Sequence, residues 1–113
     1  MQKNYLKNID FSTALTLAEL VTYQPGQVVS KTLAQNPAVS LTLFAFDQGE
    51  EISSHESNGD AMVIALDGEG EITIDSEKHL LKAGQTIVMP AKTPHAVYAS
   101  QQFKMFLVVV FPN

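Results

Sequence analysis

Hydrophobic residues in this chain recur in short runs between turn residues, and no long segment shows apolar residues at helical spacing. The runs are rich in Val, Ile, Leu, Thr and Phe, which favour strands, and they end at Gly, Pro, Asn and Asp, as in the turn Asp67–Gly70. The pattern predicts an all-β domain with one short helical turn near Thr13–Val21, capped by Ser12 or Thr13. The expected strands are Val28–Leu33, Val39–Phe46, Ala61–Leu66, Glu71–Ile74, Lys78–Leu81, Thr86–Met89, His95–Ala99 and Phe103–Phe111.

Eight short antiparallel strands must close into a barrel or form two packed sheets, because open strand edges invite aggregation. Two of the expected strands, Val39–Phe46 and Phe103–Phe111, are apolar at nearly every position. One face of each strand fills the barrel, so the other face needs a covering layer. We therefore expect a homodimer whose sheets pack back to back, with the N-terminal strand crossing over.

Composition narrows the class of protein. A chain of 113 residues forms a single domain, 1–113, in which 1–34 is expected to be an arm and strand at the dimer interface and 35–113 the barrel. The net charge of -5 and the dispersed lysines argue against nucleic-acid and membrane partners. The absence of cysteine excludes disulfides and thiolate metal sites. The start of the chain has no apolar signal-peptide stretch, so we expect a cytoplasmic protein.

Candidate chemistry is concentrated in two segments that begin at a glycine turn and end in a histidine. The first runs from Gly49 to His55, and the second runs from Gly84 to His95. In a small β-barrel these segments would bring the two imidazoles together. His79 follows a separate turn and is expected to be exposed to solvent.

At these residues the sequence resembles the cupin superfamily, in particular its small single-domain members. The first cupin motif has a glycine, two histidines one residue apart, a glutamate and a turn glycine, and the second has glycine, proline, glycine and histidine. The matching residues are Gly49, His55 and Gly68 in the first motif and Gly84, Pro90 and His95 in the second, where Lys92 replaces the middle glycine. The resemblance implies a double-stranded β-helix, or jelly-roll barrel, that is usually dimeric.

Cupins typically hold a divalent metal with three histidines and one glutamate, and two of these ligands are missing here. Ser57 stands at the second histidine position, and Ala61 stands at the glutamate position. The resemblance implies iron, manganese, nickel or zinc as a cofactor held by His55 and His95, with Asp60 as a substitute ligand. Strand alternation points Asp60 outward unless Asn58-Gly59 forms a bulge, and it also argues against Glu56.

The expected function is that of a cupin barrel binding a compact, partly apolar molecule in its lumen, with or without a weakly held metal. The alternative is a metal-dependent dioxygenase or isomerase acting on a small organic substrate, and a third reading is an interaction module that works through its dimer face. The sequence assigns no catalytic residue and leaves open whether the protein is an enzyme. The expected ligand pocket, from motif position and strand parity, comprises His55, Ser57, Ala61, Val63, Met89, His95 and Val97.

Overall fold

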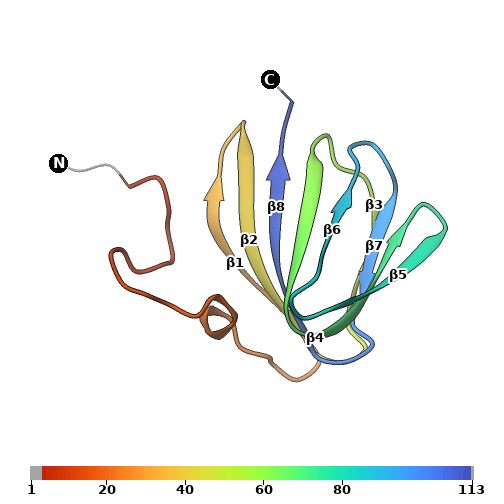
Figure 1. Ribbon diagram of the computed structural model, residues 1–113, viewed down its shortest axis with the longest axis horizontal. Helices are drawn as coiled ribbons and strands as arrows, with labels where there is room; N and C mark the ends of the chain where they lie inside the picture. Colours follow the sequence, from red (N-terminus) through yellow and green to blue (C-terminus); the bar gives the residue numbers. More distant parts are fainter. Residues whose placement is uncertain (1–3, 113) are drawn as a thin grey trace.

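The computed structural model describes residues 4–112, and it consists almost entirely of β-strands that form one curled sheet (Figure 1). The elements are η1 (Leu17–Leu20), β1 (Val28–Gln35), β2 (Val39–Phe46), β3 (Glu51–His55), β4 (Asp60–Ile74), β5 (Glu77–Lys82), β6 (Thr86–Met89), β7 (His95–Tyr98) and β8 (Phe103–Val110). This confirms the predicted all-β fold with one short helical turn. Within residues 4–112, no helix is long and apolar enough to cross a membrane.

The helical turn η1 lies within the predicted segment, but neither predicted residue caps it. Its N-cap residue is Thr16, whose side chain makes no capping hydrogen bond. The Thr13 hydroxyl instead donates to the carbonyl oxygen of Phe11 at 3.1 Å. The turn is therefore held in place by packing against the barrel and not by a side-chain cap.

Strand β4 belongs to both halves of the curled sheet. Its first part pairs with β8 and β6, so that one half of the sheet has the order β1-β2-β8-β4-β6. Its second part pairs with β7 and β5, and β3 pairs with the other edge of β7. All of these pairings are antiparallel, and together they form the predicted jelly roll.

An irregularity between Ala65 and Asp67 lets β4 keep an apolar face toward the lumen along its whole length. Before it, the buried positions are odd-numbered and end at Ala65, whereas after it Gly70 and Ile72 are buried. In a regular strand the side chains at these later buried positions would face away from the lumen. The segment Asp67–Gly70 was predicted as a turn between two strands, and it is instead part of one continuous strand.

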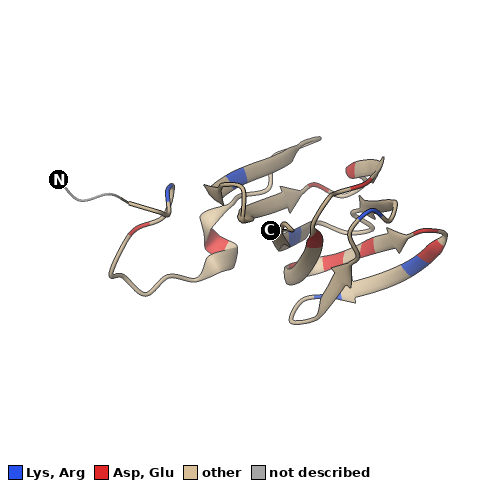
Figure 2. Cartoon of the chain, turned by 90° about the horizontal axis from the view of Figure 1, so that it is seen from above, with Lys and Arg blue, Asp and Glu red and all other residues tan. Residues whose placement is uncertain are grey.

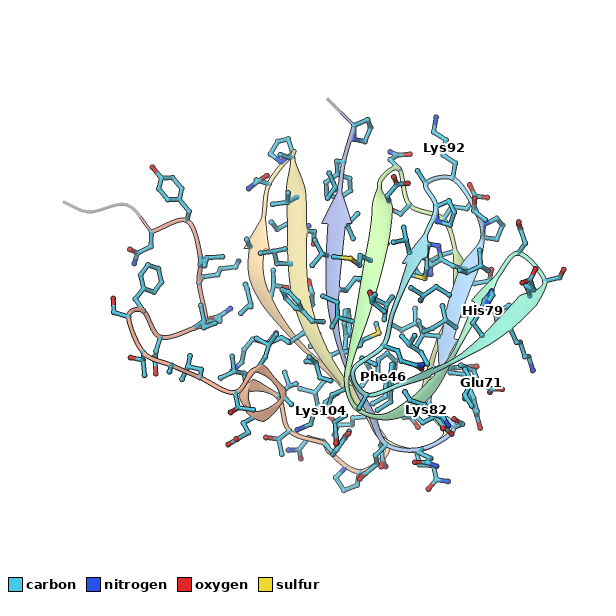
Figure 3. The ribbon with its side chains drawn as sticks, viewed as in Figure 1. Phe46, Glu71, His79, Lys82, Lys92 and Lys104 are labelled. Atoms are coloured by element: carbon cyan, nitrogen blue, oxygen red, sulfur yellow. The ribbon has the colours of Figure 1, made fainter. Side chains whose placement is uncertain are left out.

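The lumen is filled at one end by aromatic side chains. The ring centroids of Phe46 and Phe103 are 6.0 Å apart, and both side chains are fully buried. Gly70 allows the Phe103 ring to lie close to the β4 backbone, since a Cβ at this position would lie 2.7 Å from the ring. Figure 3 shows Phe46 at this filled end and Lys92 at the opposite end of the barrel.

A second apolar cluster covers the outer face of β2 and β8. Val21 and the η1 residues Leu17 and Leu20 pack there with Leu43 and Phe106. The N-terminal segment of the same chain thus supplies the covering layer that the two apolar strands require. β1 pairs with β2 along nearly its whole length, so residues 28–34 belong to the barrel sheet, and the homodimer stays a prediction.

Polar contacts hold the N-terminal segment on this face. The Lys104 ammonium donates to the carbonyl oxygen of Ala18 at 2.6 Å and lies 4.9 Å from the centroid of the Tyr23 ring. The Tyr23 hydroxyl donates to Asp67 Oδ2 at 2.5 Å. Burial, the hydrogen bond to Asp67 and the charge of that carboxylate together raise the pKa of Tyr23 well above its usual range.

We expect Gly68→Ala to destabilise the protein by about 3–5 kcal/mol or to prevent folding. Gly68 has a φ of +69°, and an added Cβ would lie 1.7 Å from the carbonyl oxygen of Gln102. Gly26 has a similar φ of +66° but nothing within 4 Å of the added Cβ, so Gly26→Ala should cost only about 1–2 kcal/mol. Urea unfolding of both variants measures the difference, and equal losses would contradict the backbone clash.

Candidate functional site

A β-bulge in β3 brings the two predicted histidines opposite each other. Ile52 pairs with Val97 and His55 pairs with His95, so three steps along β3 match two steps along β7. In a regular ladder Ser54 would face His95 instead. The extra residue therefore turns the imidazole of His55 toward the lumen, and strand parity alone did not reveal this bulge.

The two imidazoles are adjacent, and each is anchored by a backbone carbonyl group two residues earlier in the chain. Their ring centroids are 4.4 Å apart, with an interplanar angle of 71°. Nδ1 of His55 lies 2.9 Å from the carbonyl oxygen of Ser53, and Nδ1 of His95 lies 3.0 Å from that of Thr93. A carbonyl oxygen only accepts, so each Nδ1 carries the proton and each Nε2 of the neutral ring keeps a free lone pair.

The environment of His95 favours its neutral form. Its side chain is buried, with 3% of its surface exposed, whereas His55 is exposed. Burial is the main cause that lowers the pKa of His95, and the neighbouring His55 lowers it further. The hydrogen bond to Thr93 and the negative charge of Glu56 act in the opposite direction but do not cancel the decrease.

The histidines lie on the wall of a cavity of about 300 Å³ at the end of the lumen that Phe46 and Phe103 leave unfilled. Of the predicted pocket residues, six line this cavity, and Val63 does not because other core side chains cover it completely. The complete lining is Phe44, Ile52, His55, Glu56, Ser57, Ala61, Met89, His95, Val97, Met105, Leu107 and Val109. Whether these residues bind a ligand stays a prediction.

Glu56 is a cavity residue that sequence reasoning missed. Alternation with His55 had placed it outside the lumen, but β3 ends at His55, and the alternation of a strand does not continue into the following loop. The only signal in the sequence is that Glu56 lies next to a motif histidine. Its carboxylate adds a negative charge to the polar end of the cavity.

Asp60 does not join the histidines. Its Oδ1 accepts a hydrogen bond from the backbone N–H of Ala91 at 2.9 Å, and the residue lines a different, external hollow. The segment Asn58-Gly59 does not re-aim it, and the Gly59 N–H donates to Ser57 Oγ at 3.1 Å. Among residues 4–112 no group of three or more His, Cys, Asp or Glu side chains is arranged to hold a metal ion. The donor set therefore does not fit a tightly held divalent metal.

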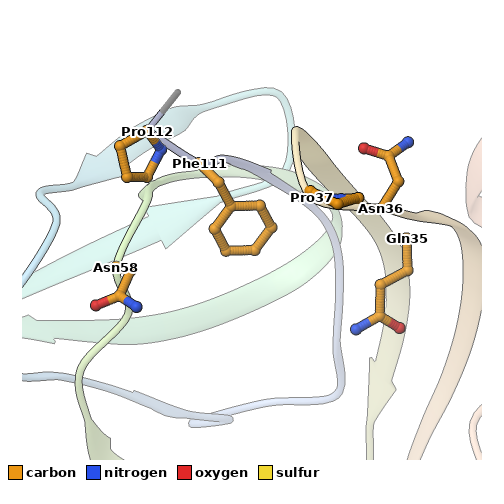
Figure 4. Close-up of a pocket in the computed structure, with 6 residues that line it drawn as sticks. All are labelled: Gln35, Asn36, Pro37, Asn58, Phe111 and Pro112. Atoms are coloured by element: carbon orange, nitrogen blue, oxygen red, sulfur yellow. The ribbon is translucent and has the colours of Figure 1, made fainter.

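Other features lie away from this cavity. A larger hollow of about 430 Å³ lies at the barrel rim, and Figure 4 shows its lining of Gln35, Asn36, Pro37, Asn58, Phe111 and Pro112. None of these side chains transfers a proton near neutral pH or is a strong metal ligand, so the histidine cavity is the better candidate for chemistry. His79 lies on β5, where its Nε2 is 3.5 Å from Glu77 Oε1.

The comparisons with known proteins agree with this geometry. Residues 42–111 match the family described as Cupin domain. A conserved protein of unknown function from Streptococcus pyogenes superposes with a TM-score of 0.96 at 47% identity, covering 98% of this chain and 97% of that chain. A cupin superfamily protein from Desulfitobacterium hafniense gives a TM-score of 0.90 at 36% identity, covering 95% and 98% of the two chains.

One more distant structure shares only the fold. It is salicylate 1,2-dioxygenase from Pseudoaminobacter salicylatoxidans, with a TM-score of 0.69 at 20% identity, covering 79% of this chain and 26% of that chain. A search among curated proteins gave no match.

We expect the free energy of unfolding to fall as the pH is lowered from about 7.5 to about 5, in part because of His95. Its pKa is lowered in the folded state, so below the unfolded pKa of 6.5 the unfolded chain takes up a proton that the folded chain resists. Above that pH the contribution vanishes. Urea unfolding should show a weaker pH dependence in His95→Gln than in the wild-type protein. An unchanged slope in His95→Gln would contradict the interpretation.

Proposed function

Because this chain belongs to the cupin family, we propose that it binds a small organic molecule in the cavity beside His55 and His95. The observation that carries the proposal is a pair of imidazoles with free Nε2 atoms at the polar end of an otherwise apolar cavity. The volume of about 300 Å³ is at the small end of the range for ligand pockets, so the ligand is compact.

A purely structural role for the two histidines does not account for their free Nε2 atoms, whereas ligand binding does. The rings do not hydrogen-bond to each other, and each uses only its Nδ1 to anchor itself to its own backbone. No buried side-chain nitrogen or oxygen among residues 4–112 lacks a partner, so each Nε2 lies where it can be reached and can accept a hydrogen bond from a ligand. Binding of a polar group at this end of the cavity accounts for both Nε2 atoms.

A metal-dependent dioxygenase or isomerase is the second candidate, and the two free Nε2 atoms are the observation that favours it. Iron, manganese, nickel and zinc all accept imidazole ligands. Held by His55 and His95 alone, such an ion would be weakly bound, and water or the organic ligand would complete its coordination. The likeness to the dioxygenase supports the fold and carries no argument about the reaction.

We also propose a homodimer. Several large apolar side chains of the N-terminal segment stay exposed in the single chain, including Leu6, Phe11 and Leu15, and a second copy would cover them. The cytoplasmic location and the absence of nucleic-acid and membrane partners stay predictions from the sequence.

We expect benzyl alcohol, a compact neutral probe, to shift the ¹³C-methyl resonances of Met89 and Met105, which line the cavity, and not that of Met62, which does not. A benzene ring fits an apolar cavity of roughly 150 Å³, so there is room for this probe. Ala61→Leu fills part of the cavity and should weaken binding about tenfold. Ala96→Leu makes the same change on the outer face of β7 and should leave binding unchanged. Equal shifts at all three methionines would contradict binding in the lumen.

We expect untagged protein to contain clearly less than one equivalent of transition metal by elemental mass spectrometry, because no three ligand side chains within residues 4–112 are arranged to hold an ion. The His55→Ala/His95→Ala double variant should lose whatever metal is bound. Near-stoichiometric metal that disappears in the double variant would overturn the expectation and favour the metalloenzyme candidate.

A further inference from the structure

The polar end of the cavity consists almost entirely of hydrogen-bond acceptors. Both imidazoles use their only N–H, at Nδ1, on backbone carbonyl oxygens, and each presents a lone pair at Nε2. Neither Nε2 has a protein partner among the residues that the structure describes, and no buried side-chain nitrogen or oxygen there is left unsatisfied. Nε2 of the buried His95 therefore faces accessible space, and the cavity is the space that this ring lines.

Glu56 adds the third acceptor, and we call His55, Glu56 and His95 the acceptor cluster. Glu56 lines the same cavity as both histidines, and its negative charge acts on His95. When ionised, a carboxylate only accepts hydrogen bonds, and it favours a positive charge nearby. The cluster thus combines two neutral acceptors with one negative charge.

Donors are nearly absent from the cavity wall. Its one side-chain donor is the hydroxyl of Ser57, whose oxygen already accepts from the Gly59 N–H. None of the lining residues is Lys, Arg, Asn or Gln. Lys92 lies three residues before His95 in the sequence, but Figure 3 shows its side chain pointing away from the barrel. Its backbone N–H donates to the carbonyl oxygen of Ser57 at 2.7 Å.

The charges of the chain reinforce this selectivity. The net charge is -5, and Figure 2 shows the acidic positions spread over strands and loops among the basic ones. An anion approaching the cavity would meet a negative field and, inside, one hydroxyl donor against three acceptors. Desolvating a carboxylate without enough donors is strongly unfavourable.

We propose that the ligand is a compact apolar molecule that carries a primary ammonium group, and that the acceptor cluster binds this group. An ammonium has three N–H donors, one for each member of the cluster, and its charge opposes that of Glu56. The apolar body lies against Phe44, Met105 and Leu107. This inference rests on the proposed function, because it specifies the ligand of the same cavity.

The test compares three probes that share one ring and differ only in the polar group: benzylamine, benzyl alcohol and benzoate. Untagged protein is first treated with a chelator, and binding is followed by the Met89 and Met105 methyl resonances. Benzylamine should bind at least about tenfold more tightly than benzyl alcohol, and benzoate should bind more weakly than both. Benzoate binding as tightly as benzylamine would overturn the inference.

A charge-removing variant assigns the preference to Glu56. Glu56→Gln keeps the shape of the side chain and should weaken benzylamine binding about tenfold without changing benzyl alcohol binding. Glu51→Gln removes the same charge on β3, on the outer face of the barrel and away from the cavity, and should change neither. Equal effects of the two variants would contradict direct binding by Glu56.

The three probes also distinguish a failure of the ammonium proposal from a failure of the proposed function. Binding of benzyl alcohol without any preference for benzylamine would overturn the ammonium and leave the proposed function standing. Failure of all three probes to bind would contradict both.

A divalent metal is the alternative cation, since it also binds to acceptor atoms. If added Zn²⁺ displaced benzylamine weakly or not at all, the ammonium would stand; tight benzoate binding only with Zn²⁺ would assign the cluster to the metal.

Discussion

One strand, β4, sets the geometry on which the rest of the molecule depends. It hydrogen-bonds to β8 and β6 in its first part and to β7 and β5 in its second part, so both halves of the curled sheet are positioned by the same backbone. This works only because the irregularity after Ala65 switches the inward parity, and because Gly68 passes close to Gln102. A single strand that serves both halves fixes their separation, and that separation defines the lumen in which the cavity lies.

The site depends on a second irregularity of the same kind. The bulge in β3 moves His55 into register with His95, and each ring is then anchored by the carbonyl oxygen of the residue two positions earlier in the chain. This repeated local hydrogen bond determines the tautomer as well as the direction of each ring. The chemical character of the cavity, two lone pairs with no accompanying donor, therefore follows from backbone geometry and not from the identity of the histidines alone.

Much of the fold was predictable from the sequence because alternation and turn residues are local signals. Strands β2 and β6 have the predicted bounds, and the structure shows that the alternate β8 residues Met105, Leu107 and Val109 line the lumen. The missed features are not local. Strand β3 is short and polar, and only its pairing with β7 makes it a strand.

The same distinction explains what was missed around the site. Glu56 reaches the cavity because β3 stops one residue earlier, and a strand's end is set by its neighbours. The outer face of β2 is covered by a segment that is distant in sequence, so its apolar pattern did not reveal which layer covers it. Asp60, by contrast, obeys simple alternation and accepts from Ala91 outside the cavity, as the sequence indicated.

Two positions where the cupin motif implies metal ligands carry other residues in this chain, and the residues around them give the cavity its character. Ligands for a metal ion are necessarily acceptors, so a cupin barrel built around such a set is already selective for positive charge. Ser57 and Ala61, which stand where the cupin motif implies a histidine and a glutamate, have short side chains, and both line the cavity beside His55 and His95. The cavity is lined mostly by apolar side chains, and His55, His95 and Glu56 supply acceptors. The proposed organic cation would therefore use the same kind of acceptors that a metal would use, with its apolar body beside the short side chains of Ser57 and Ala61.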